Sequence, residues 1–237
     1  MRTARGFTLI EMAIVLIIVT ILIGGLAVPL TAQIQARRVA ETNRTLEDAR
    51  TALLGYAMTH YASSPATNHY LPCPDTTGDG REDRVGTSCA AQHGLLPWVD
   101  LGTAPQDAWG NRLRYAVISA FADTSSGFSA STVFPDMLAV CTTHTCDKTN
   151  PDVAKDVVFV LVSHGPNGWG ARNVNGNTLA APSGLDETEN LNTNLIYISR
   201  SPTKPDSASG EFDDLAAWAS RSYLIARVCP TGSDCNP

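Results

Sequence analysis

The sequence predicts an α+β protein in which one long N-terminal helix packs on a small antiparallel β-sheet. Three features indicate this fold class. A long apolar run opens the chain, a stripe of apolar residues at helical spacing follows it, and short β-branched runs separated by turn residues fill the remainder. With 237 residues, of which 43% are hydrophobic and 17% charged, the chain is long and apolar enough to bury a core, which argues against wholesale disorder.

The first element is the apolar run. Residues 6–25 read GFTLIEMAIVLIIVTILIGG, and the nineteen residues Met12–Leu30 carry no charge. A helix of that length is about enough to cross a hydrocarbon core of ~30 Å. Because Arg2 and Arg5 precede the run, the positive-inside rule places the N-terminus in the cytoplasm. We therefore expect one membrane pass.

Glu11 distinguishes three interpretations of this run. A secretory signal peptide has a shorter apolar region, and Ala32 offers a poor cleavage site. A plain membrane anchor fits the length but leaves the buried carboxylate without a partner, at a cost of several kcal/mol or more. In the third interpretation a cut between Gly6 and Phe7 exposes an α-amino group four residues before Glu11, and this amine meets the carboxylate of a neighbouring chain.

The residues Gly6-Phe7-Thr8-Leu9-Ile10-Glu11 resemble the class III signal of type IV pilins and type II secretion pseudopilins. The resemblance implies that a prepilin peptidase cleaves after Gly6, that Phe7 is then N-methylated, and that Glu11 guides assembly with other pilin-like subunits. It also implies a bacterial inner-membrane protein with its head in the periplasm. A member of this family is a filament subunit and not an enzyme.

The resemblance implies a pilin-like fold with four parts. These are a prepilin leader at 1–6, a transmembrane and assembly helix at 7–30, an amphipathic helix spine at 31–62, and a periplasmic globular head at 63–237. The residues support the spine independently, because a stripe with three- and four-residue spacing follows the apolar run. Its members are Leu46, Ala49, Leu53, Tyr56 and His60. The residues Ser63-Ser64-Pro65 end this helix.

Short apolar runs after the helix predict the strands of an antiparallel sheet. They are Leu113–Ile118, Met137–Cys141, Val157–Val162, Leu195–Ser199 and Tyr223–Val228. Between the last two, Phe212–Ser220 is expected to form a short helix. The polar, Asn- and Gly-rich stretch from Gly165 to Asn194 is expected to be a surface loop.

Six cysteines occur as three local pairs, which indicates disulfides in an oxidising compartment. The pairs are Cys73 with Cys89, Cys141 with Cys146, and Cys229 with Cys235. Six cysteines allow fifteen connectivities, so nearest-neighbour pairing is a hypothesis. Cys141-Thr-Thr-His144-Thr-Cys146 also looks like half a zinc site, but no second Cys or His cluster stands near it in the sequence.

Two acidic stretches have the composition of a calcium site. Asp213 and Asp214 resemble the acidic segment that precedes a short helix in major pseudopilins, where calcium can bind, but the dipole of a following helix explains two acids equally well. The stretch Asp75–Asp83 imitates part of a calcium loop and has Gly86 where a bidentate Glu belongs. An Asp-Gly turn explains that second stretch better.

The sequence favours a minor or specialised type II secretion pseudopilin. Asp107-Ala-Trp-Gly110-Asn is similar to a turn of major pseudopilins, whereas the length of the chain and its cysteines depart from their pattern. The alternative is a minor type IV pilin with a ligand- or surface-binding head. The net charge of −6 repels phosphates, so we expect no nucleic-acid partner. Ser163 and His164 are neighbours on a strand and point to opposite faces, so they make no catalytic pair.

Overall fold

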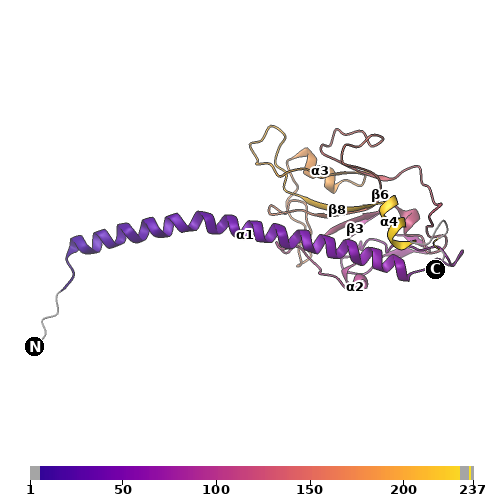
Figure 1. Cartoon of the computed structure of the whole chain (residues 1–237), viewed down its shortest axis with the longest axis horizontal. Helices are drawn as coiled ribbons and strands as arrows, with labels where there is room; N and C mark the ends of the chain where they lie inside the picture. The colour runs from indigo at the N-terminus through magenta and orange to yellow at the C-terminus, as the bar shows by residue number, and fades with distance from the viewer. Residues whose placement is uncertain (1–5, 230–234, 236–237) are drawn as a thin grey trace, which may run out of the picture. The chain divides into compact units, whose positions relative to one another are not determined.

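The computed structural model describes residues 6–229 and Cys235, and for residues 24–29 the backbone alone. These residues form two compact units, Met1–Ala40 and Glu41–Pro237. One helix, α1 (Leu9–Thr59), runs through both. It ends just before the predicted Ser63-Ser64-Pro65 stop. The second unit, which we call the head, contains every strand of the described residues (Figure 1).

The last turns of α1 belong to the core of the head. Leu46, Ala49 and Leu53 are at most 1% exposed and pack in one cluster with the strands, as the predicted stripe requires. Tyr56 and His60, the remaining members of the stripe, are half-buried at the edge, where their rings stack 3.6 Å apart. An apolar stripe on a polar helix is what holds a helix against a sheet.

A mixed six-stranded sheet forms the centre of the head. Its strand order is β3 (His93–Leu95), β4 (Arg114–Val117), β6 (Ala154–Ser163), β5 (Leu138–Cys141) and β7 (Ile196–Ile198), and β8 (Leu215–Ser220) also pairs with β6. Antiparallel pairs join β6 to β4, β5 and β8, with Tyr115 opposite Leu161 and Trp218 opposite Val160. The pair β5–β7 is parallel, so the sheet is mixed where we predicted an antiparallel one.

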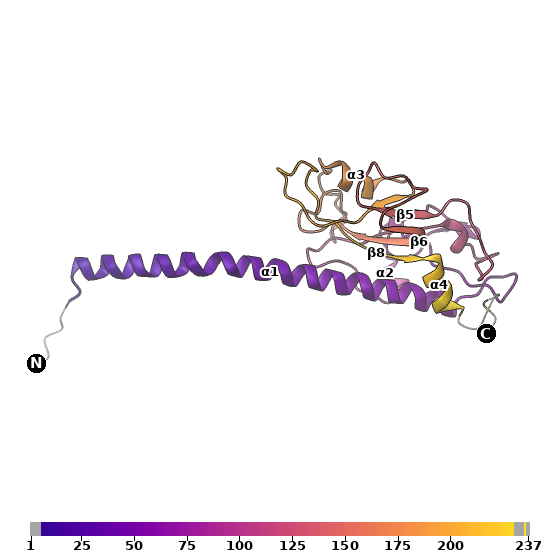
Figure 2. The same ribbon diagram turned by 45° about the horizontal axis from the view of Figure 1, so that its top comes forward.

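Both faces of the sheet are covered. Tyr197 of β7 faces the main core with α1, whereas its neighbours Ile196 and Ile198 face a second apolar cluster that includes Phe212. This alternation is the period of two expected for a strand between two layers. The helix α3 (Leu185–Leu191) packs beside β7, and in both views it lies across the sheet from α4 (Arg221–Val228) (Figure 2).

Short elements complete the head. A two-stranded hairpin, β1 (Arg84–Val85) and β2 (Ser88–Cys89), precedes the main sheet. The single-turn helices α2 (Trp98–Leu101) and η1 (Ser119–Phe121) flank β4 in the sequence.

Two predictions near the C-terminus were wrong. Phe212–Ser220, expected to be helical, contains the strand β8, because pairing with β6 overrides the helix preference of its alanines. Tyr223–Val228, expected to be a strand, lies in α4. The hydroxyl of Ser220 accepts a hydrogen bond from the Tyr223 N–H and caps this helix, and Leu224 and Val228 are buried one turn apart.

The stretch Gly165–Asn194 is more than the surface loop that we predicted. It includes α3, in which Asp186, Glu187 and Asn190 are each at most 3% exposed. Composition alone suggested a surface position for these polar residues. They are buried because each hydrogen-bonds to another segment of the head.

No helix among the described residues is both long enough and apolar enough to cross a membrane. This finding contradicts our expectation of a single-pass inner-membrane anchor with a cytoplasmic N-terminus and a periplasmic head.

Candidate functional site

A reciprocal capping box begins the long helix. Glu11 Oε2 accepts hydrogen bonds from the Thr8 N–H and the Thr8 hydroxyl, both at 2.8 Å, and the Glu11 N–H donates to the Thr8 hydroxyl at 3.3 Å. This arrangement satisfies N–H groups that have no partner inside the helix. The backbone hydrogen bond from Thr8 lowers the pKa of Glu11 below its ordinary value. Glu11 therefore has a partner within its own chain, which the sequence interpretation did not foresee.

The residues on both sides of Glu11 present apolar side chains to solvent, and those within α1 do so all around the helix. Phe7 is 82% exposed and Leu9 is 89% exposed. The exposed apolar residues continue along the helix as Ile10, Met12, Ile14, Val15, Leu16, Ile17, Ile18, Val19, Ile21, Leu22 and Ile23. An apolar surface of this extent marks an interaction site, because a helix that is apolar on every side is stable only when other apolar groups cover it.

Three carboxylates meet inside the head. Glu187 of α3 lies with Asp213 and Asp214, which precede β8, and their carboxylate oxygens are within 4.8 Å of one another. Asn167 connects two of them, because its side chain donates to Glu187 Oε1 at 3.1 Å and its N–H donates to Asp213 Oδ2 at 3.2 Å. Asn190 donates to Asp214 Oδ2 at 2.8 Å.

Two oxygens of this cluster are buried without a hydrogen-bond partner. They are Glu187 Oε2 and Asp213 Oδ1. Burial raises the pKa of Asp213 to about 7, and the nearby charges of Glu187 and Asp214 act in the same direction. Burial also raises the pKa of Glu187. Three acids with two unpartnered oxygens fit a hard cation, because Ca²⁺ prefers carboxylate and carbonyl oxygens.

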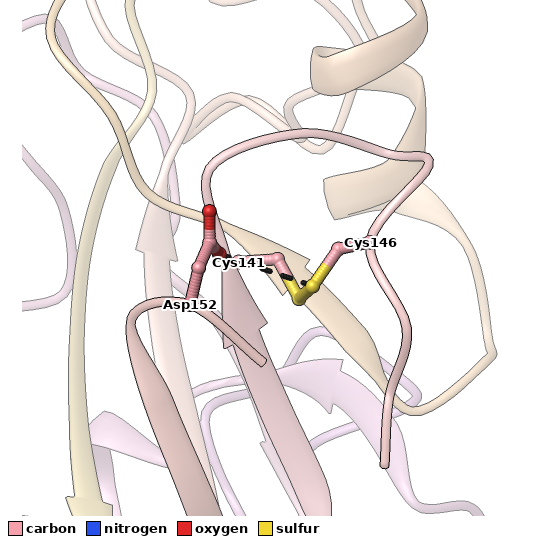
Figure 3. A group of neighbouring side chains, drawn as sticks. All are labelled: Cys141, Cys146 and Asp152. Carbon is pink, nitrogen blue, oxygen red and sulfur yellow. Dashed lines mark hydrogen bonds between the residues drawn. A yellow bond between two sulfur atoms is a disulfide. The ribbon is translucent and has the colours of Figure 1, made fainter. Parts of the chain in front are cut away.

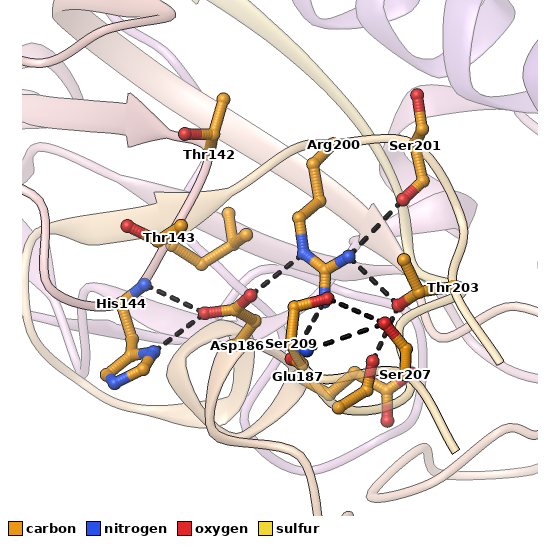
Figure 4. A network of polar contacts seen from close by, with 12 residues as sticks. Thr142, Thr143, His144, Asp186, Glu187, Arg200, Ser201, Thr203, Ser207 and Ser209 are labelled. Atoms are coloured by element: carbon orange, nitrogen blue, oxygen red, sulfur yellow. Dashed lines mark hydrogen bonds and ion pairs between the residues drawn. The ribbon is translucent and has the colours of Figure 1, made fainter. Parts of the chain in front are cut away.

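The neighbouring Asp186 differs from the three clustered acids, because both of its oxygens accept hydrogen bonds. His144 donates to Asp186 Oδ1 through its N–H at 2.9 Å, and the Nδ1 of its ring lies 2.8 Å from the same oxygen. Arg200 donates to Asp186 Oδ2 at 2.8 Å (Figure 4). Burial opposes ionisation of Asp186, but these hydrogen bonds outweigh it and hold its pKa below the ordinary value. Asp186 is therefore structural, whereas Glu187 and Asp213 each keep a buried oxygen without a hydrogen-bond partner.

Comparison with known proteins identifies the N-terminal segment. Residues 1–27 match the family model of the prokaryotic N-terminal methylation motif. The chain carries the prepilin cleavage signature of type IV pilins and pseudopilins. No curated protein and no solved structure matches the chain.

The prepilin motif supports a type IV pilin-like or pseudopilin subunit. It implies processing by a prepilin peptidase and assembly with pilin-like subunits. Proteins of this family are structural subunits and not enzymes. The family match covers the first 27 residues and does not extend to the head.

Three disulfides join the cysteines of the head. They pair Cys73 with Cys89, Cys141 with Cys146, and Cys229 with Cys235. The second disulfide places its sulfurs beside Asp152 (Figure 3). Sulfurs in a disulfide are not thiolates and hold no zinc, and the nearby His144 contacts Asp186 instead.

The structure gives separate partners to the two residues that resembled a catalytic pair. The Ser163 hydroxyl donates to Asp107 Oδ2 at 2.7 Å, and His164 Nδ1 lies 3.3 Å from Asp214 Oδ1. Asp107 also accepts the N–H groups of Trp109 and Asn111, both at 2.9 Å. Its role is to close the turn that leads into β4.

The calcium-like stretch after Cys73 is also a turn. Asp75 accepts the N–H groups of Thr77, Gly78 and Gly80. Asp83 accepts the N–H groups of Thr76 and Thr77. Carboxylates that receive this many N–H donors are already satisfied, so they are poor ligands for a cation.

Sequence reasoning found Asp213 and Asp214 but missed Glu187 as the third acid of the cluster. No local signal connects it to them, because Glu187 lies on α3, which packs beside β7, whereas Asp213 and Asp214 precede β8. The capping box, by contrast, has a recognisable sequence pattern. Thr8-Leu9-Ile10-Glu11 is the T-x-x-E pattern of a helix start, and this pattern overlaps the family motif.

Proposed function

We propose that the chain is a structural subunit of a type IV filament-like assembly, and that it is a minor or specialised type II secretion pseudopilin. The observation that carries the proposal is the combination of the prepilin motif with a helix whose apolar side chains are exposed on every side. Copies of such helices in a shared bundle cover one another. The residues of the turn at Asp107 resemble a segment of major pseudopilins, and this resemblance supports the secretion branch. In this chain the turn is closed by the hydrogen bonds of Asp107 and by the φ of 87° at Gly110.

The geometry of Glu11 supports a specific role in assembly. Both donors of Thr8 bind Oε2, and no donor among the described residues binds Oε1. Cleavage after Gly6 gives Phe7 a charged amine. When helices pack side by side, the amine of one subunit reaches the free oxygen of Glu11 in the next, and the pair is neutralised inside the bundle. The register between subunits follows from this contact.

The test combines mass spectrometry of the mature protein with one substitution. We expect the mature chain to begin with N-methylated Phe7. Glu11→Leu should leave expression of the folded head intact and abolish incorporation into filaments, measured by shearing and immunoblotting. The matched control is Glu41→Leu, which removes an exposed acid from the same helix and should assemble normally.

Two results would contradict the proposal. One is a mature chain that begins elsewhere, near Gln33 for example. The other is normal assembly of Glu11→Leu. Equal loss in both variants would show that an added leucine, and not the lost carboxylate, disturbs assembly.

We also propose that the cluster of Glu187, Asp213 and Asp214 binds Ca²⁺. The support is the pair of unpartnered buried oxygens together with the raised pKa of Asp213. A bound divalent cation would satisfy both oxygens and hold α3 against the segment that precedes β8. The test is an increase in Tm when Ca²⁺ is added to metal-free protein.

A further inference from the structure

A cavity of about 330 Å³ opens on the head where β3 and β4 meet two loops. Three arginines, two histidines and one acid contribute to its wall. They are Arg112, Arg114, Arg172, His93, His164 and Asp75. The volume is within the range of pockets that hold small molecules. This concentration of positive charge is notable in a chain with a net charge of −6.

The three guanidinium groups are held by neutral groups and not by acids. Arg114 donates to the carbonyl of Leu191 at 2.8 Å, and Arg172 donates to the carbonyl of Thr77 at 3.2 Å. Arg112 donates to the carbonyl of Pro105 at 3.0 Å. Within the described part of the chain, none of the three forms a salt bridge. Their positions are therefore fixed while their charges remain unpaired.

Asp75, the one acid that lines the cavity, does not balance the positive charge of the three arginines. Asp75 directs its oxygens to the N–H groups of Thr77, Gly78 and Gly80. Three arginines face one carboxylate, which leaves an excess of positive charge. Burial, followed by the charge of Arg172, lowers the pKa of Arg112 in spite of Asp75. A cavity of this kind attracts anions.

Two further groups indicate a ligand with oxygen acceptors. Arg114 Nε is buried without a hydrogen-bond partner. Arg112 is stacked on the Trp98 ring at 4.0 Å, which leaves the edge of its guanidinium available for in-plane hydrogen bonds. Guanidinium groups bind carboxylate and phosphate oxygens in pairs, so a ligand with two or more such oxygens fits this wall.

We propose that this cavity binds a small anion that carries phosphate or carboxylate oxygens, with Arg112, Arg114 and Arg172 as its ligands. The ligand is a free small molecule, because the cavity is too small for a folded partner and large enough for a phosphate or a short dicarboxylate. The proposal is independent of the filament role, since it uses residues of the head alone.

The test is calorimetric titration of the full chain, kept monomeric in a non-ionic detergent and freed of metal ions. Inorganic phosphate and succinate are titrated separately at constant ionic strength, which distinguishes the two kinds of oxygen. We expect one of them to bind, and Arg172→Gln to weaken that binding about tenfold or more, since a hydrogen bond to a charged group is lost. Arg227→Gln, an exposed arginine on α4, is the matched control and should bind as the parent does.

The ring of His93 reports where the anion sits. Burial and the charge of Arg114 lower the pKa of His93 to about 4. An anion in the cavity should raise this pKa, as measured by NMR of the ring nitrogens with and without the ligand. Three results would overturn the proposal. They are no binding of either probe up to about 10 mM, equal binding by Arg172→Gln, and binding that leaves the His93 titration unchanged.

Discussion

At the scale of single residues, a carboxylate is defined by what its oxygens contact. Glu11, Asp186 and Asp213 are all acids near a helix or strand end, and they differ in their donors. Thr8 supplies two donors to Glu11, whereas His144 and Arg200 satisfy Asp186. Asp213 keeps one oxygen without any donor. The first acid therefore has a partner in its own chain, the second is structural, and the third keeps a buried oxygen to which we propose that a cation binds.

Gly165 is the residue that lets β6 end against the carboxylate cluster. Its φ is 57°, and a Cβ at this position would overlap the carbonyl and carboxylate oxygens of Asp213. We expect Gly165→Ala to reduce the free energy of unfolding by about 2–4 kcal/mol, through backbone strain and the steric overlap together. Urea unfolding followed by circular dichroism measures this loss.

Gly176 provides the control for that substitution. Its φ is 83°, and the nearest atom to an added Cβ is 3.9 Å away. Gly176→Ala therefore adds strain without overlap, and it should cost about 1–2 kcal/mol. Equal losses in the two variants would mean that the contact with Asp213 contributes nothing.

At the scale of elements, the sequence predicted the strands whose signal is local. The β-branched runs around Tyr115, Val140 and Val160 became β4, β5 and β6, because continuous burial selects such residues. The helix predicted for Phe212–Ser220 was wrong because this segment becomes the strand β8 by pairing with β6. The alanines of β8 carry no strand signal of their own, so the pairing was invisible in the sequence.

The carboxylate cluster and the cationic cavity could not be predicted from the sequence either, because each combines residues that are distant in the sequence. Glu187 joins Asp213 only through the packing of α3, and the cationic cavity combines residues from four separate segments. The net charge of −6 argued against a nucleic-acid partner, and a total charge cannot show the local excess of arginine in the cavity wall. By contrast, the prepilin motif is contiguous, so the sequence was sufficient to find it.

The carboxylate cluster predicts that stabilisation by calcium depends on pH. Burial raises the pKa of Asp213 from 3.8 to about 7. The fold thus favours protonated Asp213, and this contribution to stability is complete below about pH 4 and is lost as the pH rises through about 7. Ca²⁺ replaces the proton, so its effect must increase over the same range. We expect excess Ca²⁺ to raise the Tm by about 5–10 °C at pH 8 and by little at pH 5.

Scanning calorimetry of the metal-free protein with and without Ca²⁺ measures this difference. Asp213→Asn should abolish the gain in Tm, and Asp206→Asn, an exposed acid in the loop before β8, should retain it. A gain that is independent of pH, or one that survives Asp213→Asn, would place calcium elsewhere.

At the scale of the whole molecule, the prepilin motif and the folded core lie in different units. The unit Glu41–Pro237 has its own apolar core, three disulfides and both proposed ligand sites. The first unit contains the prepilin motif and the exposed apolar residues. A unit with a complete core keeps its stability when a distant exposed residue is changed.

This separation predicts the behaviour of a chain that cannot be processed. Gly6→Leu should block cleavage, because the residue before the cut is part of the motif, and the precursor should accumulate and fail to assemble. The Tm of the head should remain within about 1 °C of the parent value, since effects at distant sites are independent. Immunoblotting measures the size of the chain, and calorimetry in detergent measures the Tm. A markedly lower Tm in Gly6→Leu would show that the prepilin segment and the head are energetically coupled, and that assembly and folding are not separate properties of this protein.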